Sequence, residues 1–538
     1  MRLSRIQITN YARIPDVDLN LGKQVVLVGP NDVGKTCILR CLHFALGASL
    51  ASLHQNISAK DVRDPSEAMK ISVDLVEFSD EERSVLPDEI SVSTAGEEVL
   101  TILLEVEVFP GDEAELSIRR SFPASGHHRP PTRSQLAAVG WQYLPAVRSG
   151  GAEGVEGRAS ALRALLGSVD FGAEKAAISD AIDDLNSTLR ASSTLADLRA
   201  AMASHLSLAT YREVIPDNLS FRTASTPDDM LRLLGLFLDR DGTIRPIAEQ
   251  SDGFNALAAI AFYDLSASGS NIVAIDEPET HLHPAAQRAL AELLAAGTNQ
   301  KIISTHSPFI VQRFDPEDVV AFSADRRSRQ LPRGALNKTD KVLAQWWIAS
   351  RLEPLTARRV LFVEGSADRI LIEACVGAAG ISLDKLGVSV VELGGAASFR
   401  QAHRMFGAEG FNIDVIGLVD EDHEEAWASD LGVPVAELNQ HGIFVSRKDL
   451  EAEYVLALGE EGARNALVDS GAFTLPHILK SCDVSAEADL TISLVTSFCG
   501  KSRNKVQAAL AASTVLTADH IDKMDGVKGL VNKLRSFS

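Results

Sequence analysis

Apolar and polar residues alternate along the first part of the chain in the manner of β-strands. Residues 3–28 fit two strands around a turn, and the apolar stretch at 37–47 fits a helix. Between about residues 70 and 120, further alternating segments predict an antiparallel sheet. The pattern becomes helical from 160 to 235, and a second block of strands and helices follows from 244 to 325.

The second half of the chain also mixes strands and helices. Residues 326–357 predict a linker that contains a helix, and a new strand–helix pattern begins with RRVLFVEG at 358. After about residue 470 the pattern is mainly helical. One hydrophobic core rarely grows past about 250 to 300 residues, so the 538 residues predict several cores. The expected fold class is α/β.

The chain is acidic overall, which narrows its range of partners. Its 52 basic and 73 acidic residues give 52 − 73 = −21. This charge disfavours broad adhesion to nucleic acid or to anionic membranes. Any contact with nucleic acid must therefore be local, or bridged by metal. With 45% hydrophobic and 23% charged residues, the composition is that of an ordinary globular protein.

Several features favour a cytoplasmic location. The five cysteines have no Cys-x-x-Cys spacing, so they suggest neither a disulfide framework nor a zinc site. The N-terminus alternates like a strand and lacks the apolar core of a signal peptide. No run of about 18 apolar residues predicts a membrane span. We therefore expect no membrane partner.

A phosphate-binding pattern lies near the N-terminus. The segment VVLVGPNDVGKTCIL contains GxxxxGK[ST], with a strand before it and a helix after it. Gly29 and Gly34 let backbone N–H groups and the helix N-terminus surround phosphates. Lys35 can neutralise the β and γ phosphates, and Thr36 can offer a hydroxyl to Mg²⁺. The pattern predicts a nucleotide site, with a Gly-rich turn that binds no nucleotide as the simpler alternative.

Two later segments supply the other groups that a nucleotide-hydrolysing site needs. In NIVAIDEPETHLHP, four apolar residues lead into a pair of acids. Asp276 would bind magnesium and Glu277 would orient the attacking water. The apolar strand in KIISTHSPFIV leads to His306, which can touch the γ-phosphate. A satisfied core histidine remains the alternative for His306.

Together these segments resemble the ABC-type ATPase head of the group that includes SMC proteins and the overcoming-lysogenization-defect (OLD) nucleases. In that group a signature loop completes the site of the partner subunit. AEQSDGFNALAAIAF resembles this loop, with Asp252 replacing the first glycine and Asn255 the final glutamine. The resemblance implies ATP as cofactor and the following binding residues: Gly29, Asn31, Gly34, Lys35, Thr36, Ser251, Gly253, Asp276 and His306.

Acidic residues gather at the ends of two further strands. RRVLFVEG leads to Glu364, and DVIGLVDED delivers Asp420 and Asp422. Side chains two apart on a strand point to the same side, so the two aspartates can chelate one ion. If the strands are neighbours in a parallel sheet, Glu364 lies beside them at the C-terminal edge. The pattern predicts a site for Mg²⁺ or Mn²⁺.

A glutamate at one strand end and Asp-x-Asp at another resemble the Toprim domain. An ABC-type head with a helical insertion, followed by Toprim, resembles the OLD family endonucleases over essentially the whole chain. The resemblance implies that Asp368, Asp449 and Glu451 complete two metal positions. It also implies a lysine that stabilises charge on the phosphate, Lys505 or less favourably Lys501. A charged helical face would explain each of these residues almost as well.

The resemblance thus assigns two overlapping sets of residues. The catalytic set is Glu364, Asp420, Asp422, Glu451, Lys505 and, in the ATPase, Glu277. The metal ligands are Glu364, Asp368, Asp420, Asp422, Asp449, Glu451 and, beside the nucleotide, Thr36 and Asp276. Two ions about 3.5 to 4 Å apart would activate water and stabilise the leaving oxygen of a phosphodiester.

The expected domain organisation follows the resemblance. It comprises an ATPase N-terminal lobe (1–160), a helical insertion for dimerisation (161–235), an ATPase C-terminal lobe (236–325), a linker (326–357), a Toprim nuclease core (358–470) and a helical C-terminal region (471–538).

The leading hypothesis is an ATPase and metal-dependent DNA endonuclease, under nucleotide control, in prokaryotic anti-phage defence. The resemblance implies a homo-oligomer, dimer or tetramer, and allows a helicase-like partner protein. The alternative is an ATP-switched DNA-binding scaffold of SMC type with an inactive Toprim domain, the acids at 420–425 being a solvated edge. A topoisomerase needs a nucleophilic tyrosine and is disfavoured, because Tyr454 is the only tyrosine after residue 263.

Overall fold

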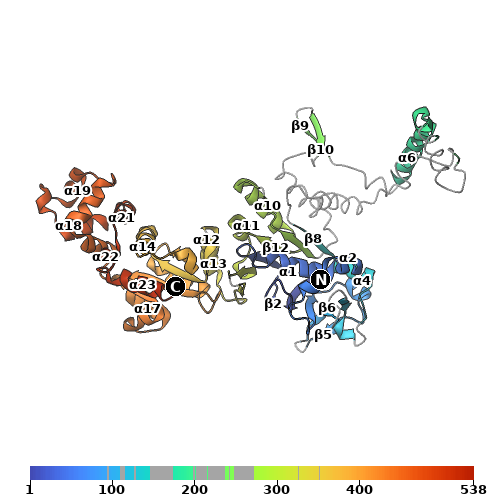
Figure 1. Ribbon diagram of the computed structural model, residues 1–538, viewed down its shortest axis with the longest axis horizontal. Coiled ribbons are helices and arrows are strands. Elements are labelled where there is room, and N and C mark those ends of the chain that lie inside the picture. The colour runs from blue at the N-terminus through green and yellow to red at the C-terminus, as the bar shows by residue number, and fades with distance from the viewer. Residues whose placement is uncertain are drawn as a thin grey trace.

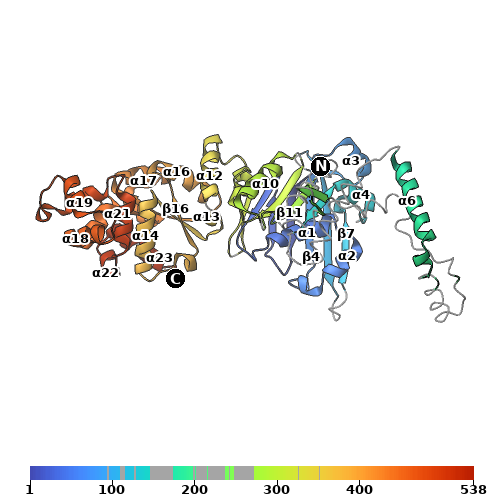
Figure 2. The ribbon, with the colours of Figure 1, turned by 90° about the horizontal axis from the view of Figure 1, so that it is seen from above.

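The molecule is elongated, with a head and a C-terminal part placed along its long axis (Figures 1 and 2). The two parts meet around helices α12 (Lys338–Ser350) and α13 (Glu353–Thr356). The α/β fold class predicted from the sequence is confirmed. The computed structural model describes residues 1–93, 96–109, 116–125, 129–145, 174–197, 200, 215, 237–240, 243–246, 272–280, 282–297, 299–324, 326–350 and 352–537.

The first sheet of the head is antiparallel and has the strand order β2-β1-β4-β6-β5, with β7 also paired to β6. In β4 every second residue is buried, as alternation requires of a sheet with one covered face. The buried residues pack in one core with helix α1 (Lys35–Leu46). The strands are β1 (Arg2–Thr9), β2 (Val17–Asn20), β4 (Met69–Val76), β5 (Ser91–Val92), β6 (Glu98–Val108) and β7 (Leu116–Ser121).

The second sheet of the head is parallel except at one edge. Its order is β14-β13-β3-β12-β11-β8, with β14 antiparallel. The sequence pattern had not indicated β8, a short strand with only one buried residue. The strands are β3 (Gln24–Val28), β8 (Trp141–Leu144), β11 (Ile272–Asp276), β12 (Gln300–Thr305), β13 (Val319–Phe322) and β14 (Ser328–Gln330).

Both faces of this parallel sheet are covered. Val25 and Leu27 of β3 belong to the core shared with α1, whereas Val26 and Val28 belong to a second core with helix α10 (Pro284–Ala296). A strand buried on both faces favours apolar residues at consecutive positions, which explains the apolar runs in the sequence. Because β3, β12 and β11 are parallel neighbours, the segments that follow them meet at one edge.

Smaller elements complete the described head. Among them is α6, the main described part of the expected helical insertion at 161–235, most of which lies outside the described residues. The strands β9 and β10 form an antiparallel pair. These elements are α2 (Leu50–Asn56), α3 (Asp80–Val85), α4 (Arg133–Val139), α6 (Glu174–Ala191), β9 (Phe237–Arg240), β10 (Thr243–Pro246) and α11 (Pro308–Val311).

Helix α12 joins the cores of the two parts. Trp347 is 5% exposed and belongs to a hydrophobic cluster that runs from β3 of the head to the C-terminal part. Its ring lies 6.2 Å from that of Phe406. Arg404 reinforces the junction, because its guanidinium lies 3.2 Å from Asp340 and donates to the carbonyl of Ala335. The segment expected as a linker is therefore packed, and it also contributes β14 to the head sheet.

The C-terminal part is built on a four-stranded parallel sheet of order β16-β15-β17-β18. Alternate residues of β15 again enter two cores. Phe362 packs with α16 and α17, whereas Leu361 packs with α14, α18, α21 and α23. The strands are β15 (Arg359–Val363), β16 (Val388–Glu392), β17 (Asp414–Asp420) and β18 (Ile443–Ser446).

The helical tail after residue 470 has no separate core. Its apolar residues share one cluster with β15, α14 and α18, so it forms part of the same folded body. The helices of the C-terminal part are α14 (Ser366–Ala378), α15 (Leu383–Leu386), α16 (Phe399–Phe406), α17 (Glu424–Leu431), α18 (Leu450–Asp469), α19 (Leu475–Cys482), α20 (Ile492–Cys499), α21 (Lys505–Ser513), α22 (Ala518–Ile521) and α23 (Asp525–Arg535). In the described residues, none of the helices is long and apolar enough to cross a membrane.

Candidate functional sites

The GxxxxGK[ST] segment forms a loop between β3 and α1, as the sequence predicted. Gly34, immediately before α1, has φ 107°, a conformation that L side chains rarely adopt. A Cβ atom there would lie 2.2 Å from Cγ2 of Ile14. Position 34 therefore requires glycine both for backbone conformation and for space. Asn31 is exposed in the loop.

The ammonium group of Lys35 is turned back onto the loop. Its Nζ donates to the carbonyl oxygens of Gly29 at 2.9 Å and Pro30 at 2.8 Å, and lies 2.9 Å from Nε2 of His306. Burial lowers the pKa of Lys35, although neighbouring carboxylates oppose the change. The amine is thus held at the loop, where phosphate oxygens could replace the carbonyl oxygens as acceptors.

The groups expected to hold magnesium are in contact. The hydroxyl of Thr36 donates to Oδ1 of Asp276 at 3.1 Å, and the hydroxyl of Ser304 donates to the same oxygen. Burial raises the pKa of Asp276, and these two hydrogen bonds oppose the rise. The parallel pairing of β11 with β12, and of β12 with β3, brings the three residues together.

Glu277 and His306 lie beside one another at the same edge. Oε1 of Glu277 is 3.7 Å from Nε2 of His306, and the backbone of Glu277 is left-handed with φ 45°. The His306 side chain is 37% exposed, so the structure does not place it as a core histidine. Burial lowers its pKa, with a further contribution from Lys35, and this favours the neutral imidazole.

Sequence reasoning assigned no role to Glu279. This acid is half-buried, its Oε1 accepts from the backbone N–H of His306, and its shielded Oε2 accepts no well-aligned hydrogen bond from the described residues. Burial raises the pKa of Glu279. Its place in DEPET was the available signal. Through its hydrogen bond with the backbone of His306, Glu279 positions the segment that carries His306. Ser251 and Gly253 of the expected signature loop lie outside the described residues.

The second site forms at the C-terminal edge of the other parallel sheet. Glu364 directly follows β15, Asp420 ends β17, and the two strands are neighbours. The backbone N–H of Asp420 donates to Oε1 of Glu364 at 3.2 Å. Asp422 is not on the strand. It lies in the following turn, Glu421–His423, and its side chain is 72% exposed. The pairing of Asp420 and Asp422 across one strand face is therefore not observed.

The surroundings of Asp420 disfavour its charged form. Burial raises its pKa to about 8, and the nearby carboxylates of Glu364 and Asp368 contribute, while Lys505 opposes them. One oxygen, Oδ1, accepts from the N–H of Leu450 at 3.1 Å. A carboxyl group whose charged form is this unfavourable would gain much from a bound cation.

Three further predicted residues lie around Asp420. Asp368 is 7% exposed and accepts from the N–H of Gly365 through Oδ2 at 2.9 Å, whereas its Oδ1 has no hydrogen-bond partner among the described residues. Glu451 is 1% exposed, and neither of its oxygens accepts a well-aligned hydrogen bond. Burial raises the pKa of both acids. Asp449 caps α18 through a 2.6 Å bond from the N–H of Ala452.

The two candidate lysines are placed differently. Nζ of Lys505 lies 3.2 Å from Oε2 of Glu451. Burial lowers the pKa of Lys505, but Glu451 and Asp368 outweigh burial, so the net shift is upward. Nζ of Lys501 instead donates to the carbonyl and hydroxyl oxygens of Ser481, each at 3.0 Å. The structure brings Lys505, and not Lys501, to the acids.

Sequence reasoning missed His423, which directly follows Asp422. Its Nδ1 lies 2.9 Å from Oδ1 of Asp422 and 3.2 Å from Oε1 of Glu364. The nearby acid Glu453 is structural, because its Oε1 accepts from the N–H groups of Arg447 and Gly526. An alternating run of charges on a helix cannot distinguish Glu451 from Glu453.

The donor set suits a hard divalent cation. Within the described residues, no three His, Cys, Asp or Glu side chains are already arranged to hold a metal ion. Glu364, Asp420, Asp368 and Glu451 nevertheless interact electrostatically, and Oδ1 of Asp368 accepts no hydrogen bond from the described residues. Carboxylate oxygens are the ligands that Mg²⁺ and Mn²⁺ prefer. The residues therefore fit such an ion, which would draw them closer together.

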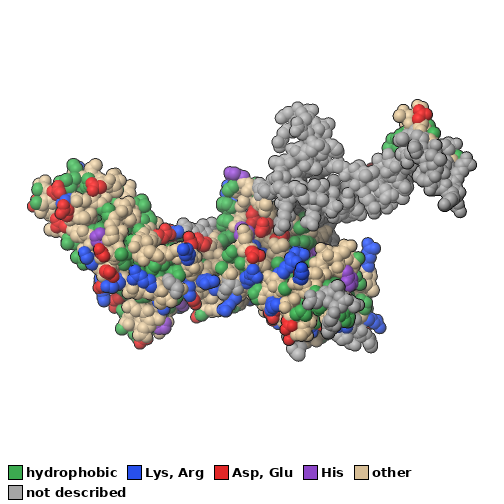
Figure 3. All heavy atoms as spheres, in the orientation of Figure 1, with side chains coloured by type: hydrophobic (Ala, Val, Ile, Leu, Met, Phe, Trp, Pro, Cys, Tyr) green, Lys and Arg blue, Asp and Glu red, His purple; other side chains and the backbone are tan. Residues whose placement is uncertain are grey.

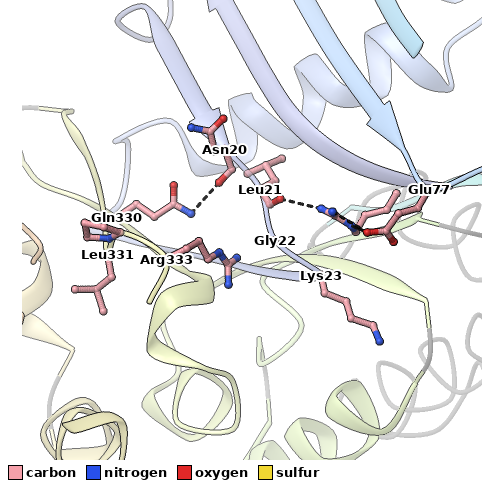
Figure 4. A pocket seen from close by; sticks show the side chains of 10 residues that line it. Asn20, Leu21, Gly22, Lys23, Glu77, Gln330, Leu331 and Arg333 are labelled. Atoms are coloured by element: carbon pink, nitrogen blue, oxygen red, sulfur yellow. Dashed lines mark hydrogen bonds and ion pairs between the residues drawn. The ribbon is translucent and has the colours of Figure 1, made fainter. Parts of the chain in front are cut away.

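A cavity of about 810 Å³ shares no residue with either site. It lies between the β2–β3 turn and β14 (Figure 4). Arg2 pairs with Glu77 at 2.9 Å, Gln330 donates to the carbonyl of Asn20, and Arg333 pairs with Asp318 at 2.8 Å. Most polar groups of the cavity already have partners, so we assign no chemistry to it.

Comparisons with known proteins agree with this division into two sites. A family model described as "AAA domain, putative AbiEii toxin, Type IV TA system" matches residues 25–312, and one described as "Overcoming lysogenization defect protein-like, TOPRIM domain" matches residues 355–422. The fold therefore defines a P-loop ATPase joined to a Toprim domain. Because the first model covers more than half of the chain and the second identifies the Toprim domain as OLD-like, the chain belongs to the OLD family of nucleases.

Two curated relatives span most of the chain. The "OLD nuclease" of Thermus scotoductus is 28% identical over 73% of this chain and 78% of its own length. "Endonuclease GajA" of Bacillus cereus is 24% identical over 73% of this chain and 71% of its own length. The solved C-terminal region of the Burkholderia pseudomallei OLD protein is 25% identical, with a TM-score of 0.28, and covers 34% of this chain and 99% of that chain.

Proposed function

We propose that this protein is an ATPase and a divalent-metal-dependent DNA endonuclease, in which nucleotide at the head controls hydrolysis of phosphodiester bonds by the Toprim domain. The main support is the arrangement around Asp420. Buried carboxylates surround a strand end, one oxygen of Asp368 accepts no hydrogen bond from the described residues, and Lys505 contacts Glu451. The names of the relatives support nuclease chemistry. DNA is the substrate and Mg²⁺ or Mn²⁺ the ion.

The chain's own residues divide the work at the Toprim site. Glu364, Asp368, Asp420, Asp422, Asp449 and Glu451 would hold divalent metal. Bound metal would supply an activated water and stabilise the leaving oxygen. Lys505, whose raised pKa keeps it charged, would stabilise negative charge on the reacting phosphate. Its contact with Glu451 holds the ammonium at the acids until the phosphate arrives.

At the head, Gly29, Asn31, Gly34 and Lys35 would bind the phosphates of ATP, with Thr36 and Asp276 beside its metal. Glu277 would orient the attacking water and His306 would contact the γ-phosphate. By family resemblance, Ser251 and Gly253 would complete the site of a second copy. The protein is then a homo-oligomer, dimer or tetramer, that acts in the cytoplasm in anti-phage defence, with a helicase-like partner protein also allowed.

The alternative, an ATP-switched DNA-binding scaffold with an inactive Toprim domain, is less favoured. A solvated acidic edge would not need buried carboxylates, yet Asp368 is 7% and Glu451 1% exposed. Burying carboxyl groups with an incomplete set of hydrogen bonds is costly, and a purely structural edge offers nothing that would offset this cost. A cation-binding site explains these buried acids better.

The direct test is cleavage of supercoiled plasmid with Mg²⁺ or Mn²⁺, with and without ATP. We expect wild-type protein to nick or linearise the plasmid, and Asp420→Ala to abolish cutting while leaving ATP binding intact. The control is Asp414→Ala, at the other end of the same strand, where the side chain is 77% exposed. Cutting by Asp420→Ala at the wild-type rate would contradict the site. A protein that hydrolyses ATP but never cuts would favour the scaffold.

A further inference from the structure

The acid cluster must accommodate an anionic substrate. The chain has a net charge of −21, and the carboxylates around Asp420 repel DNA phosphates until metal binds. Figure 3 shows acidic and basic side chains interspersed over the C-terminal part, with no broad basic surface on that face. DNA contacts must therefore come from individual cations placed near the acids. Two such cations stand on turns that border the Toprim site.

The first cation is Lys448, two residues after the end of β18. Its backbone is left-handed with φ 66°, a conformation that favours glycine or asparagine. Glu421 holds this turn, because its Oε2 accepts from the N–H of Lys448 at 2.8 Å and its Oε1 lies 3.4 Å from Nη1 of Arg447. Glu421, which lies between Asp420 and Asp422 in the sequence, thus holds the turn that carries Arg447 and Lys448.

The ammonium of Lys448 is exposed and, among the described residues, has no ion-pair or hydrogen-bond partner. Lys448 therefore adopts a backbone conformation that is unfavourable for lysine, and no side-chain contact within the described residues offsets this cost. Its side chain is instead available at the C-terminal edge of the sheet, where β15 and β17 present Glu364 and Asp420. That placement fits the recognition of a phosphate as a point charge.

The second cation is Arg503, in the turn that leads into α21. Asn504, 3% exposed, holds this turn by donating from its side chain to the carbonyl of Phe498 at 2.9 Å, and from its N–H to the carbonyl of Lys501 at 2.7 Å. Arg503 is exposed, and within the described part of the chain it has no hydrogen-bond or ion-pair partner. Two residues later, Lys505 contacts Glu451. Arg503 therefore stands in a turn held by Asn504, two residues before the lysine that reaches the acids.

We propose that Lys448 and Arg503 form a phosphate clamp that binds the DNA backbone on nucleotides flanking the scissile bond. The clamp rests on the proposed nuclease function and specifies how that site binds its substrate. Both cations stand on turns held by a buried or carboxylate side chain, so the backbone of these turns loses little conformational freedom when DNA binds. Their contacts are with phosphates, so the clamp holds DNA of any sequence.

Equilibrium binding of duplex DNA tests the clamp. In an Asp420→Asn background, which we expect not to cut, Lys448→Ser and Arg503→Ser should each weaken binding of unrelated duplexes to the same degree. Each should also reduce the slope of log affinity against log salt concentration by about 0.9, the value for one lost phosphate contact. In the wild-type background, single-turnover cleavage should fall at low protein concentration and recover at saturating protein.

The matched control is Lys385→Ser. Lys385 is an exposed lysine of α15, which precedes β16 and so stands at the opposite edge of the sheet. The Lys385→Ser variant loses the same charge, but the slope of log affinity against log salt concentration should stay at its wild-type value. Equal slopes for Lys448→Ser, Arg503→Ser and Lys385→Ser, with wild-type protein still cutting plasmid, would overturn the clamp alone. Absence of cutting by wild-type protein would instead contradict the proposed nuclease, whatever the slopes.

Discussion

At the scale of single residues, Asp420 is the acid of the Toprim site whose charged form the folded protein disfavours most clearly. Its pKa is raised from 3.8 to about 8. An acid whose pKa is higher in the folded than in the unfolded protein contributes its full stabilisation at pH values below its unfolded pKa. For Asp420, that stabilisation is lost as the pH rises through about 8. Metal-free protein should therefore become less stable from about pH 4 to pH 9, and bound cation should restore stability by favouring the ionised carboxyl group.

We accordingly expect Asp420→Asn to unfold at a higher temperature than wild type at pH 8.5 in EDTA, with no advantage at pH 4. Each kcal/mol relieved would raise the midpoint by roughly 2–4 °C. The variant should also lose most of the stabilisation that Mn²⁺ gives to wild type. Thermal unfolding at several pH values measures both effects. If Asp414→Asn behaved identically, repulsion at Asp420 would not be the cause.

The two lysines give a second residue-scale prediction. Lys505→Ala should lower the cleavage rate at saturating metal and DNA by about 100-fold or more, as loss of one charge-stabilising donor does in other enzymes. Lys501→Ala removes the same charge from a group that contacts only Ser481 in the described structure, and it should cut within a few-fold of wild type. Single-turnover rates decide this, and equal losses would contradict the placement of Lys505.

At the scale of elements, strands with long apolar runs were predicted from the sequence, whereas a strand with few buried residues was not. Strands β3, β11, β12, β15 and β17 were visible because burial on both faces gives each of them a run of consecutive apolar residues. The β8 strand has one buried residue, so it gave no comparable signal. Periodicity also cannot tell which core a helix joins, so the packing of the tail against β15 was not foreseen.

The same limit applies to the sites. Glu364 and Asp420 could be placed because strand ends fix them, whereas Asp422 lies in a turn whose geometry the strand pattern does not set. Long-range contacts, such as that of Lys505 with Glu451, need a three-dimensional fold. The contacts of His423 with Glu364 and of Glu279 with the backbone of His306 join different elements, so the sequence pattern did not reveal them.

Helix α12 yields a prediction at this scale. Trp347 is 5% exposed in the cluster that joins the two parts, whereas its neighbour Trp346 is 51% exposed. Trp347→Ala should cost about 3–5 kcal/mol by removing a buried aromatic side chain, and Trp346→Ala much less. Urea unfolding of both variants measures the difference. Similar losses would mean that α12 does not unite the cores as the packing indicates.

At the scale of the whole molecule, the proposed control of cutting requires that the state of the head reach the Toprim domain. The hydrophobic cluster through α12 provides a continuous packed connection. Glu277→Gln should bind ATP normally but hydrolyse it at least about 100-fold more slowly, because the group that orients water loses its charge. This variant therefore holds the head in its ATP-bound state.

Plasmid cleavage by Glu277→Gln with ATP should match cleavage by wild type with a non-hydrolysable ATP analogue, and should differ from cleavage without nucleotide. The direction of that difference shows whether bound ATP restrains or promotes cutting. The control is Lys35→Ala, whose lost contact with the phosphates should make cleavage indifferent to ATP. If nucleotide left cleavage by wild type and Glu277→Gln unchanged, the head would not control the nuclease, even though both sites were active.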